Sequence, residues 1–158
     1  IDITAIVMNN RIYGMTGGQF SPLSGQGKKA TTAPYSTIDR GFDIVELARS
    51  AGATFVARST VFHAMECKNL IKKAIAHKGF SAVEILTQCP TYFGRKNKEG
   101  DAVQMMEAMR DNTVKIGSKK LEKNPGLIQR GIFVENTDIP EYCAAYDTII
   151  ETAMKGKK

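Results

Sequence analysis

Cysteine is scarce in this chain of 158 residues, and its three copies, Cys67, Cys89 and Cys143, share no short spacing. An odd number of scattered cysteines argues against a disulfide framework. Together with the absence of a visible secretory signal, it favours a reducing cytoplasm. The chain also lacks an apolar run of the roughly 18 residues that a membrane helix needs, so we expect no membrane span.

Two phosphate-binding signatures are missing as well. Neither G-x-x-x-x-G-K-[ST] nor G-x-G-x-x-G occurs in the sequence. Histidine is rare, and His63 and His77 are expected to begin and end one helix, too far apart to share a metal ion. Neither histidine lies with a nucleophile, so we predict surface or capping roles for both.

The charge balance is basic, with 22 Lys and Arg against 16 Asp and Glu and a net charge of +6. The lysines are scattered or lie at helix ends and in the tail, and aromatic residues do not alternate with them. The pattern is therefore not typical of a nucleic-acid-binding surface. A solvated surface is the favoured interpretation, with docking of an acidic protein or steering of an anionic substrate as secondary ones.

What the chain does contain is a long glycine-rich loop after an apolar strand. The run 3–8 (ITAIVM) predicts a buried parallel strand, and residues 9–32 follow it without helical or strand periodicity. Open α/β sheets bind ligands where such loops leave the carboxyl ends of strands. Glycines let the backbone approach a ligand, and an asparagine oxygen with a nearby carbonyl suits a hard cation. The combination suits a magnesium–diphosphate site better than a nucleophile or an acid–base pair, but from the spacing alone a plain turn is the favoured interpretation.

After this loop, strand and helix patterns alternate. Residues 41–53 predict a helix closed by Gly52, and a second helix follows, with Ser59 or Thr60 as its cap. Strands are expected at residues 54–58 and 80–86. This order predicts an α/β fold with a mostly parallel sheet flanked by helices.

The carboxyl-terminal third has a more irregular pattern. Residues 102–114 predict a methionine-rich helix, and residues 127–135 predict a final strand with an edge of the sheet as its candidate position. A last helix is expected over 141–154, with Asp138 as the cap candidate.

Five segments carry a family resemblance: DITAIVMNNRIYGMTGGQ, KKATTAPY, AGATFVARST, KGFSAVEILTQCPTYFGR and GIFVENTDIPEY. Together they resemble the β subunit of the 2-oxoacid:ferredoxin oxidoreductases, and the 2-oxoglutarate-oxidising type is the nearest. The resemblance covers about the carboxyl-terminal half of such a subunit, because the family's Gly-Asp-Gly and amino-terminal Cys-x-x-C are missing. It implies an incomplete thiamine diphosphate-binding fold, with residues 1–95 as the cofactor-binding core and residues 96–158 as a carboxyl-terminal extension.

The resemblance also implies a set of cofactor-binding residues. A side-chain oxygen of Asn10 and the carbonyl of Ile12 would hold Mg²⁺. Gly17 stands where some relatives with a broad 2-oxoacid range carry a lysine, so recognition of the substrate carboxylate would come from elsewhere, such as another subunit. The remaining positions would shape the turn or run beside the diphosphate: Asn9, Gly14, Thr16, Gly17, Gly18 and Gln19.

Cys89 has two interpretations. From the residues alone it is a small buried side chain at a strand end. By resemblance, the cysteine of this Cys-Pro-Thr segment is the fourth ligand of a [4Fe–4S] cluster whose other three ligands lie upstream, so it is expected to be a free thiol in this chain alone. Cys67 and Cys143 fall on apolar helix faces and are expected to pack in the core.

The function implied by the resemblance is the oxidative decarboxylation of 2-oxoglutarate to an acyl-CoA, with electrons passed to ferredoxin. The expected partners are an α subunit, γ and δ subunits where the enzyme has them, ferredoxin, the 2-oxoacid and coenzyme A, with no nucleic acid and no membrane. The glutamate that activates the coenzyme is expected on a partner subunit, so no catalytic residue is predicted here and the chain alone should be inactive. Two alternatives stay open: pyruvate or another 2-oxoacid as substrate, or a catalytically inert assembly module.

Overall fold

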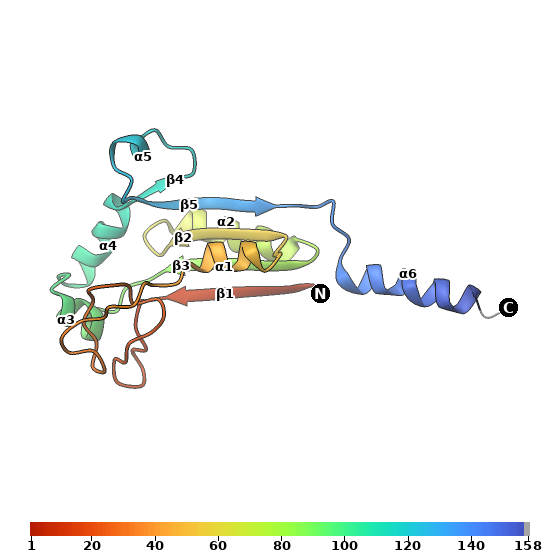
Figure 1. The fold of residues 1–158 in the computed structure, drawn as a ribbon. Coiled ribbons are helices and arrows are strands. Elements are labelled where there is room, and N and C mark those ends of the chain that lie inside the picture. Colours follow the sequence, from red (N-terminus) through yellow and green to blue (C-terminus); the bar gives the residue numbers. More distant parts are fainter. Residues whose placement is uncertain (157–158) are drawn as a thin grey trace.

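Five strands form one sheet, in the order β1-β3-β2-β5-β4, in the computed structural model, which describes residues 1–156 (Figure 1). Their bounds are Ile3–Asn9 (β1), Phe55–Thr60 (β2), Phe80–Leu86 (β3), Thr113–Lys115 (β4) and Ile128–Glu135 (β5). β1, β3 and β2 are parallel, β5 is antiparallel to β2, and β4 is parallel to β5. The predicted α/β class with a mostly parallel sheet is confirmed.

The bounds of the α-helices are Ile44–Ser50 (α1), Ala64–Ala76 (α2), Arg95–Asn97 (α3), Ala102–Asp111 (α4), Lys120–Lys123 (α5) and Tyr142–Lys155 (α6), and a π-helical turn spans Pro90–Gly94 (η1). Of these, α1 and α2 cover opposite faces of the sheet. Successive residues of β2 point to opposite faces: Phe55 packs with Leu70 of α2, whereas Val56 packs with Val45 of α1. Gly52, with a left-handed φ of +85°, closes α1 as predicted.

The edges of the sheet differ from the prediction. β1 is an edge strand with β3 as its neighbour, and its Ile6 and Met8 are 41% and 59% exposed, so the prediction of a buried strand is wrong. β5 is not an edge strand, because β4 lies outside it. β4 falls where the helix over 102–114 was expected to end, since the β-branched Thr113 and Val114 favour extended backbone.

His63 and His77 begin and end α2, as predicted. Ser59 and Thr60 belong to β2 and do not serve as the N-cap residue of that helix, so the cap prediction is wrong. Of the two roles predicted for His77, the capping one is confirmed, because His77 is the C-cap residue of α2, and it is not at the surface: it is buried, with its Nε2 atom 2.8 Å from the hydroxyl of Thr54.

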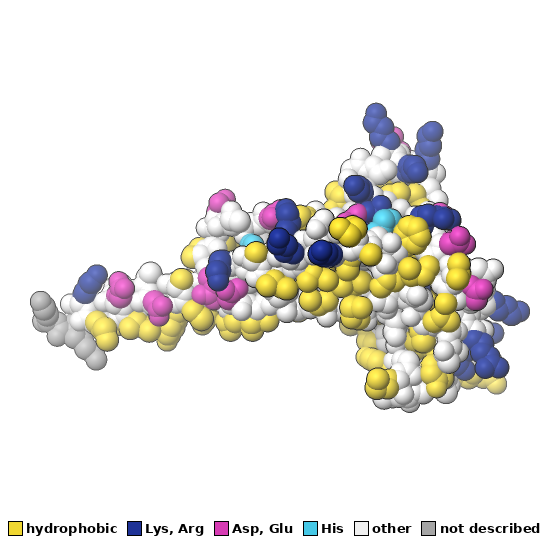
Figure 2. Space-filling model, turned by 180° about the vertical axis from the view of Figure 1, so that it is seen from behind, with side chains coloured by type: hydrophobic (Ala, Val, Ile, Leu, Met, Phe, Trp, Pro, Cys, Tyr) yellow, Lys and Arg dark blue, Asp and Glu magenta, His cyan; other side chains and the backbone are white. Residues whose placement is uncertain are grey.

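Helix α6 projects away from the sheet as an arm (Figure 1). The carboxylate of Glu141, and not that of Asp138, caps it by accepting the N–H groups of Cys143 and Ala144 at 2.8 and 3.1 Å. No side chain of α6 is buried by the described residues, so the core packing predicted for Cys143 is wrong. Hydrophobic side chains follow one side of the arm and charged ones the other (Figure 2). None of the described helices combines the length and apolar content needed to cross a bilayer.

Candidate functional site

The candidate site begins where β1 and β3 end side by side. Because the two strands are parallel and pair Asn9 with Leu86, the segments that follow them leave from the same edge of the sheet. The N–H of Thr87 donates to the carbonyl of Asn9 at 2.8 Å and ties the two exits together. The sheet therefore brings the predicted loop and the Cys89 segment to one place. We refer to residues 9–19 as the asparagine–glycine loop.

The first turn of the asparagine–glycine loop is built by its two asparagines. The Oδ1 atom of Asn9 accepts the N–H of Arg11 at 3.0 Å, and that of Asn10 accepts the N–H of Ile12 at 3.2 Å. These are Asx turns, in which a side chain hydrogen-bonds the backbone two residues on. Arg11 has a left-handed φ of +64°, uncommon outside glycine, and the turn holds it there.

The two oxygens predicted to bind magnesium lie in this same turn. The carbonyl of Ile12 accepts the N–H of Gly14 at 3.0 Å, and Asn10 Oδ1 accepts one hydrogen bond, so each oxygen keeps a second lone pair. Neutral oxygens of this kind fit Mg²⁺, which normally takes further oxygens from phosphate and water. Within residues 1–156, no three His, Cys, Asp or Glu side chains form a group that could hold a metal ion.

The glycine half of the loop passes close to neighbouring groups. Tyr13 donates its N–H to the carbonyl of Gln19 at 3.1 Å and accepts that of Gly18 at 2.9 Å. Gly17 and Gly18 have φ values of +114° and +80°, and a Cβ atom on Gly18 would lie 2.6 Å from the ring of Tyr92. Both conformation and space therefore require glycine at position 18.

Polar side chains of the glycine half are satisfied within the loop. The hydroxyl of Thr16 donates to Oε1 of Gln19, and Nε2 of Gln19 donates to the carbonyl of Thr16, both at 2.6 Å. Thr31 closes the loop from outside by donating its N–H to the carbonyl of Gly18 and its hydroxyl to that of Gly17. The segment predicted to run beside a diphosphate, residues 16–19, is therefore held in place by hydrogen bonds within the loop and to Thr31.

Cys89 lies against the asparagine–glycine loop. A Cβ atom built on Gly14 would be 3.3 Å from the Sγ atom of Cys89 and 3.7 Å from Nδ2 of Asn10, so thiol and amide flank the same glycine. Cys89 is partly buried against a small apolar cluster that includes Ile12 and Phe93. Cys67 packs on the separate core beneath α2, as predicted, where burial and then the Glu66 charge raise the pKa of its thiol.

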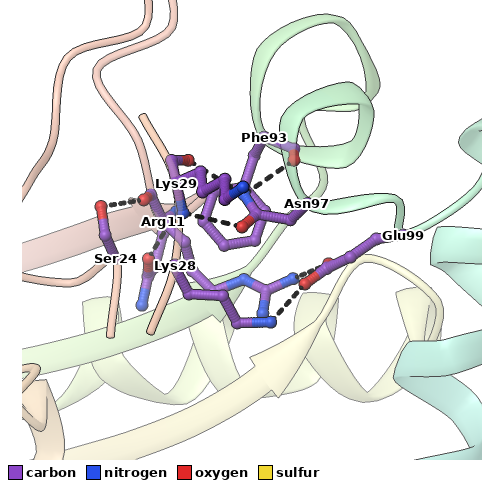
Figure 3. A network of polar contacts seen from close by, with 8 residues as sticks. Arg11, Ser24, Lys28, Lys29, Phe93, Asn97 and Glu99 are labelled. Carbon is purple, nitrogen blue, oxygen red and sulfur yellow. Dashed lines mark hydrogen bonds and ion pairs between the residues drawn. The ribbon is translucent and has the colours of Figure 1, made fainter. Parts of the chain in front are cut away.

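A second contact network connects Arg11 of the asparagine–glycine loop to residues 28–29 and 93–99 (Figure 3). Glu99 forms ion pairs with Arg11 at 2.5 Å and with Lys28 at 2.8 Å, and the guanidinium of Arg11 lies 4.2 Å from the centre of the Phe93 ring. Asn97 accepts the N–H of Lys29 and donates to its carbonyl. A cavity of about 390 Å³ lies beside this network, lined by Arg11, Lys28, Leu86, Glu99, Met105, Ala108, Met109, Asn112, Thr113 and Ile128.

Sequence reasoning missed a buried polar network that begins at Asn9. Its Nδ2 atom donates to Oε1 of Glu84 at 2.7 Å, and Oε2 of Glu84 accepts from Nε of Arg58 at 2.6 Å. Arg58 also donates to Asp43, the N-cap residue of α1, at 2.5 Å. The signal was present in the sequence: Glu84 is the charged residue of the strand segment FSAVEIL, and Arg58 is the charged residue of TFVARST.

The described geometry is a glycine-rich loop at the carboxyl edge of an α/β sheet, a position at which such sheets commonly bind ligands. Residues 1–85 match the family described as "Thiamine pyrophosphate enzyme, C-terminal TPP binding domain", where TPP is thiamine diphosphate. The chain belongs to this family.

The resemblance to 2-oxoacid:ferredoxin oxidoreductase β subunits is also confirmed. The chain is 45% identical over 154 residues to 2-oxoglutarate synthase subunit KorB of Methanothermobacter marburgensis, covering 96% of this chain and 54% of that protein. It is 42% identical over 99 residues to the 2-oxoacid:ferredoxin oxidoreductase subunit beta of Saccharolobus solfataricus, covering 63% of this chain and 32% of that one.

A solved structure gives the same result in three dimensions. The 2-oxoglutarate:ferredoxin oxidoreductase from Magnetococcus marinus, with 2-oxoglutarate, coenzyme A and succinyl-CoA bound, superposes with a TM-score of 0.80 at 27% identity. The match covers 97% of this chain and 53% of that chain. The chain thus spans about half the length of the relatives it matches.

Proposed function

We propose that this chain is the carboxyl-terminal part of the β subunit of a 2-oxoglutarate:ferredoxin oxidoreductase. The complete enzyme would oxidatively decarboxylate 2-oxoglutarate, transfer the acyl group to coenzyme A and pass the electrons to ferredoxin. The observation that carries the proposal is the asparagine–glycine loop beside Cys89, at the carboxyl edge of the sheet. The chain that forms it is 45% identical over 154 residues to a 2-oxoglutarate synthase subunit.

In this proposal the loop binds Mg²⁺ and the diphosphate of thiamine diphosphate. Asn10 Oδ1 and the carbonyl of Ile12 are the metal ligands from this chain, because both oxygens lie in one turn and keep a free lone pair. Asn9 and Gly14 shape that turn. The segment Thr16–Gln19, with Gly17 and Gly18 in left-handed conformations, follows the diphosphate. The bound coenzyme supplies the electron sink for decarboxylation, while these residues bind and orient it.

Cys89 is proposed as one ligand of a [4Fe–4S] cluster. Its thiol flanks the same glycine as the Asn10 amide, so a cluster held there would adjoin the coenzyme loop and electrons would have a short path. A cluster needs more ligands than one thiolate, and these would come from residues outside this chain.

The proposed partners are an α subunit, with γ and δ subunits where the enzyme has them, and ferredoxin. A subunit role fits the arm α6, whose apolar Tyr142, Tyr146 and Ile149 are 62%, 52% and 61% exposed. We propose residues 1–95 as the cofactor-binding core and 96–158 as an extension that serves assembly. A cytoplasmic location is proposed as well, because Cys67, Cys89 and Cys143 are all free thiols in the structure.

The test uses the complete enzyme containing this chain. Reduction of ferredoxin or a viologen dye is measured with 2-oxoglutarate or pyruvate in the presence of coenzyme A, and Mg²⁺-dependent coenzyme binding is measured by calorimetry. We expect turnover with 2-oxoglutarate and a loss of coenzyme affinity of at least about tenfold in Asn10→Ala. Asn69→Ala, on the exposed side of α2, is the control and should bind as the unaltered enzyme does.

Two results would overturn parts of the proposal. Turnover with pyruvate and not 2-oxoglutarate would move the chain to another enzyme of the same class. Unchanged coenzyme binding in Asn10→Ala would remove the metal assignment. An assembly module without catalysis, which the unburied arm α6 also favours, would co-purify with its partners yet bind no thiamine diphosphate.

A further inference from the structure

Two charged side chains lie inside the sheet next to the asparagine–glycine loop. Glu84 of β3 is 3% exposed and Arg58 of β2 is 8% exposed. Burying a charge is costly unless it is paired and hydrogen-bonded, and an apolar pair of similar volume often stabilises a protein as well or better. A packing role alone therefore gives little reason for a carboxylate at this position.

The hydrogen bonds of Glu84 point to the loop. Its Oε1 atom accepts from Nδ2 of Asn9 at 2.7 Å, and its Oε2 atom accepts from Nε of Arg58 at 2.6 Å. With Nδ2 held in this way, the other end of the Asn9 amide, Oδ1, is directed at the N–H of Arg11. The bond to Glu84 thus fixes which way the Asn9 amide faces.

Arg58 holds the carboxylate in turn. It reaches Glu84 with Nε and Asp43 with Nη2, at 2.6 and 2.5 Å, so the guanidinium is clamped between two carboxylates. Asp43 also accepts the N–H groups of Val45 and Glu46 at the start of α1. The loop turn is therefore connected through three side chains to a helix on the face of the sheet.

We propose that Glu84, held by Arg58, is a positioning residue that fixes the Asn9 turn and thereby the two oxygens of Asn10 and Ile12 that face the metal-bound diphosphate. The inference rests on the proposed function. Glu84 acts only through Asn9, and nothing in the geometry brings it to the metal itself. Removing an outer partner of this kind typically weakens metal affinity roughly 10- to 100-fold.

Glu84→Gln is the diagnostic substitution. Both carboxylate oxygens accept hydrogen bonds, and a glutamine has one acceptor and one NH₂ group in their place. The NH₂ group would face a donor, so the contact with either Asn9 or Arg58 is lost. In the complete enzyme we expect E84Q to raise the Mg²⁺ concentration needed for half-maximal thiamine diphosphate binding roughly 10- to 100-fold, measured by calorimetry.

A second substitution restores the pairing. With Asn9→Asp added to E84Q, the glutamine NH₂ meets a carboxylate, its carbonyl still accepts from Arg58, and the new aspartate still accepts from the N–H of Arg11. The double variant should return the Mg²⁺ requirement to within about threefold of the unaltered enzyme. Such recovery would show that the contact between positions 9 and 84 sets the Mg²⁺ requirement.

Ser81→Ala is the matched control. Ser81 lies on the same strand, is fully buried and donates to the carbonyl of Ala74 at 3.0 Å, away from the loop. Its substitution should lower the melting temperature and leave the Mg²⁺ requirement unchanged.

The possible outcomes distinguish a failure of the positioning role of Glu84 from a failure of the proposed function. An unchanged Mg²⁺ requirement in E84Q, or no recovery in the double variant, overturns the positioning role. If the E84Q enzyme fails to assemble, Asn9→Ala tests the same link from the loop side, and an unchanged requirement there overturns it equally. Absence of Mg²⁺-dependent coenzyme binding in the unaltered enzyme would overturn the proposed function instead.

Discussion

Gly18 is constrained both by its left-handed backbone conformation and by a close neighbour, Tyr92, and substitutions can separate the two constraints. Its φ is +80° and a Cβ atom would lie 2.6 Å from the Tyr92 ring, whereas Gly25 has a φ of +84° and nothing within 4 Å of its Cβ position. A left-handed conformation costs a residue with a Cβ atom about 1–2 kcal/mol, and overpacking adds about 1–3 kcal/mol.

We therefore expect Gly18→Ala to lower the free energy of unfolding by roughly 2–5 kcal/mol, and Gly25→Ala to lower it by only about 1–2 kcal/mol. Urea denaturation of the 158-residue chain measures both. Equal losses in the two variants would mean that Tyr92 moves aside without cost and that the loop is not closely packed at this point.

His63 provides a pH-dependent test at the start of α2. Burial lowers the pKa of its imidazole below the usual 6.5, and the positive charge of Arg130 lowers it further. The unfolded chain therefore binds a proton more readily than the folded one as the pH falls. The stability that the neutral imidazole contributes is complete above about pH 6.5 and is lost as the pH falls from 6.5 through the lower, folded-state pKa.

His63→Gln removes this titration and leaves all other groups in place. We expect the difference in unfolding free energy, unaltered chain minus variant, to decrease between pH 7.5 and about pH 5. Denaturant unfolding at several pH values gives that difference, and other titrating groups cancel in it. A difference that stays constant with pH would contradict the lowered pKa.

At the scale of elements, helix α4 packs against the asparagine–glycine loop. Its Met105 is buried in the cluster with Ile12 and Phe93, and its first turn is closed by a capping box. In this box the Asp101 carboxylate accepts the N–H of Gln104, and the Gln104 side chain accepts the N–H of Asp101, both at 2.9 Å.

Asp101→Ala removes the acceptor and should lower the free energy of unfolding by about 1 kcal/mol, within the usual range of roughly 0.5–2 kcal/mol for N-caps. Asp101→Asn keeps a side-chain oxygen and should remain close to the unaltered chain. Thermal unfolding of the three proteins compares them. Equal melting temperatures for the alanine and asparagine variants would show that α4 does not depend on this cap.

The sequence predicted those elements that are marked by an apolar run and by the residues that bound it. The strand over 80–86 forms with those bounds, because its apolar run is bounded by a glycine and by a polar segment. The short β4 was missed, since three residues next to a helix carry no period and pair only through β5. The exposure of β1 was missed for a related reason. An apolar run predicts a buried strand, but the sequence of the run does not show whether strands flank it on both sides.

The candidate site also combines features that the sequence indicated with contacts that it did not. Asn9, Asn10 and Cys89 were singled out from the sequence, and parallel pairing of β1 with β3 brings their segments together. The contacts that hold the loop were not predictable, because they join distant positions. Arg11 and Glu99 are 88 residues apart, and Asn9 and Glu84 are 75 apart, so no local periodicity links them.

At the scale of the whole molecule, the described chain is packed unevenly. The sheet centre is covered by α1 and α2, while the edge strand β1 exposes Ile3, Ile6 and Met8 and the arm α6 has no buried side chain. Apolar side chains line the arm and continue onto the body (Figure 2). Helices draw most of their stability from packing, so α6 should be locally less stable than the helices that cover the sheet.

Hydrogen exchange measures this difference, and the molecule contains its own control. α6 has 14 residues and α2 has 13, but α2 buries Leu70 and Ala74 against the sheet. An isolated helix of this length is marginal in water, so the amides of α6 should open by local fraying, whereas those of α2 should need a larger unfolding event. We expect α6 in the isolated chain to exchange at least ~100-fold faster than α2.

A truncated chain that ends at residue 141 tests α6 from the other direction, because it keeps the ion pair between Glu141 and the amino group of Ile1. If α6 contributes no packing, its removal should change the free energy of unfolding of the remainder by less than about 0.5 kcal/mol. Protection of α6 equal to that of α2, or a large loss of stability on truncation, would mean that the arm is held by contacts in solution. Slow exchange that appears only in the complete enzyme would instead show that assembly covers the arm, since burying Tyr146 and Ile149 would then supply the packing that this chain alone does not.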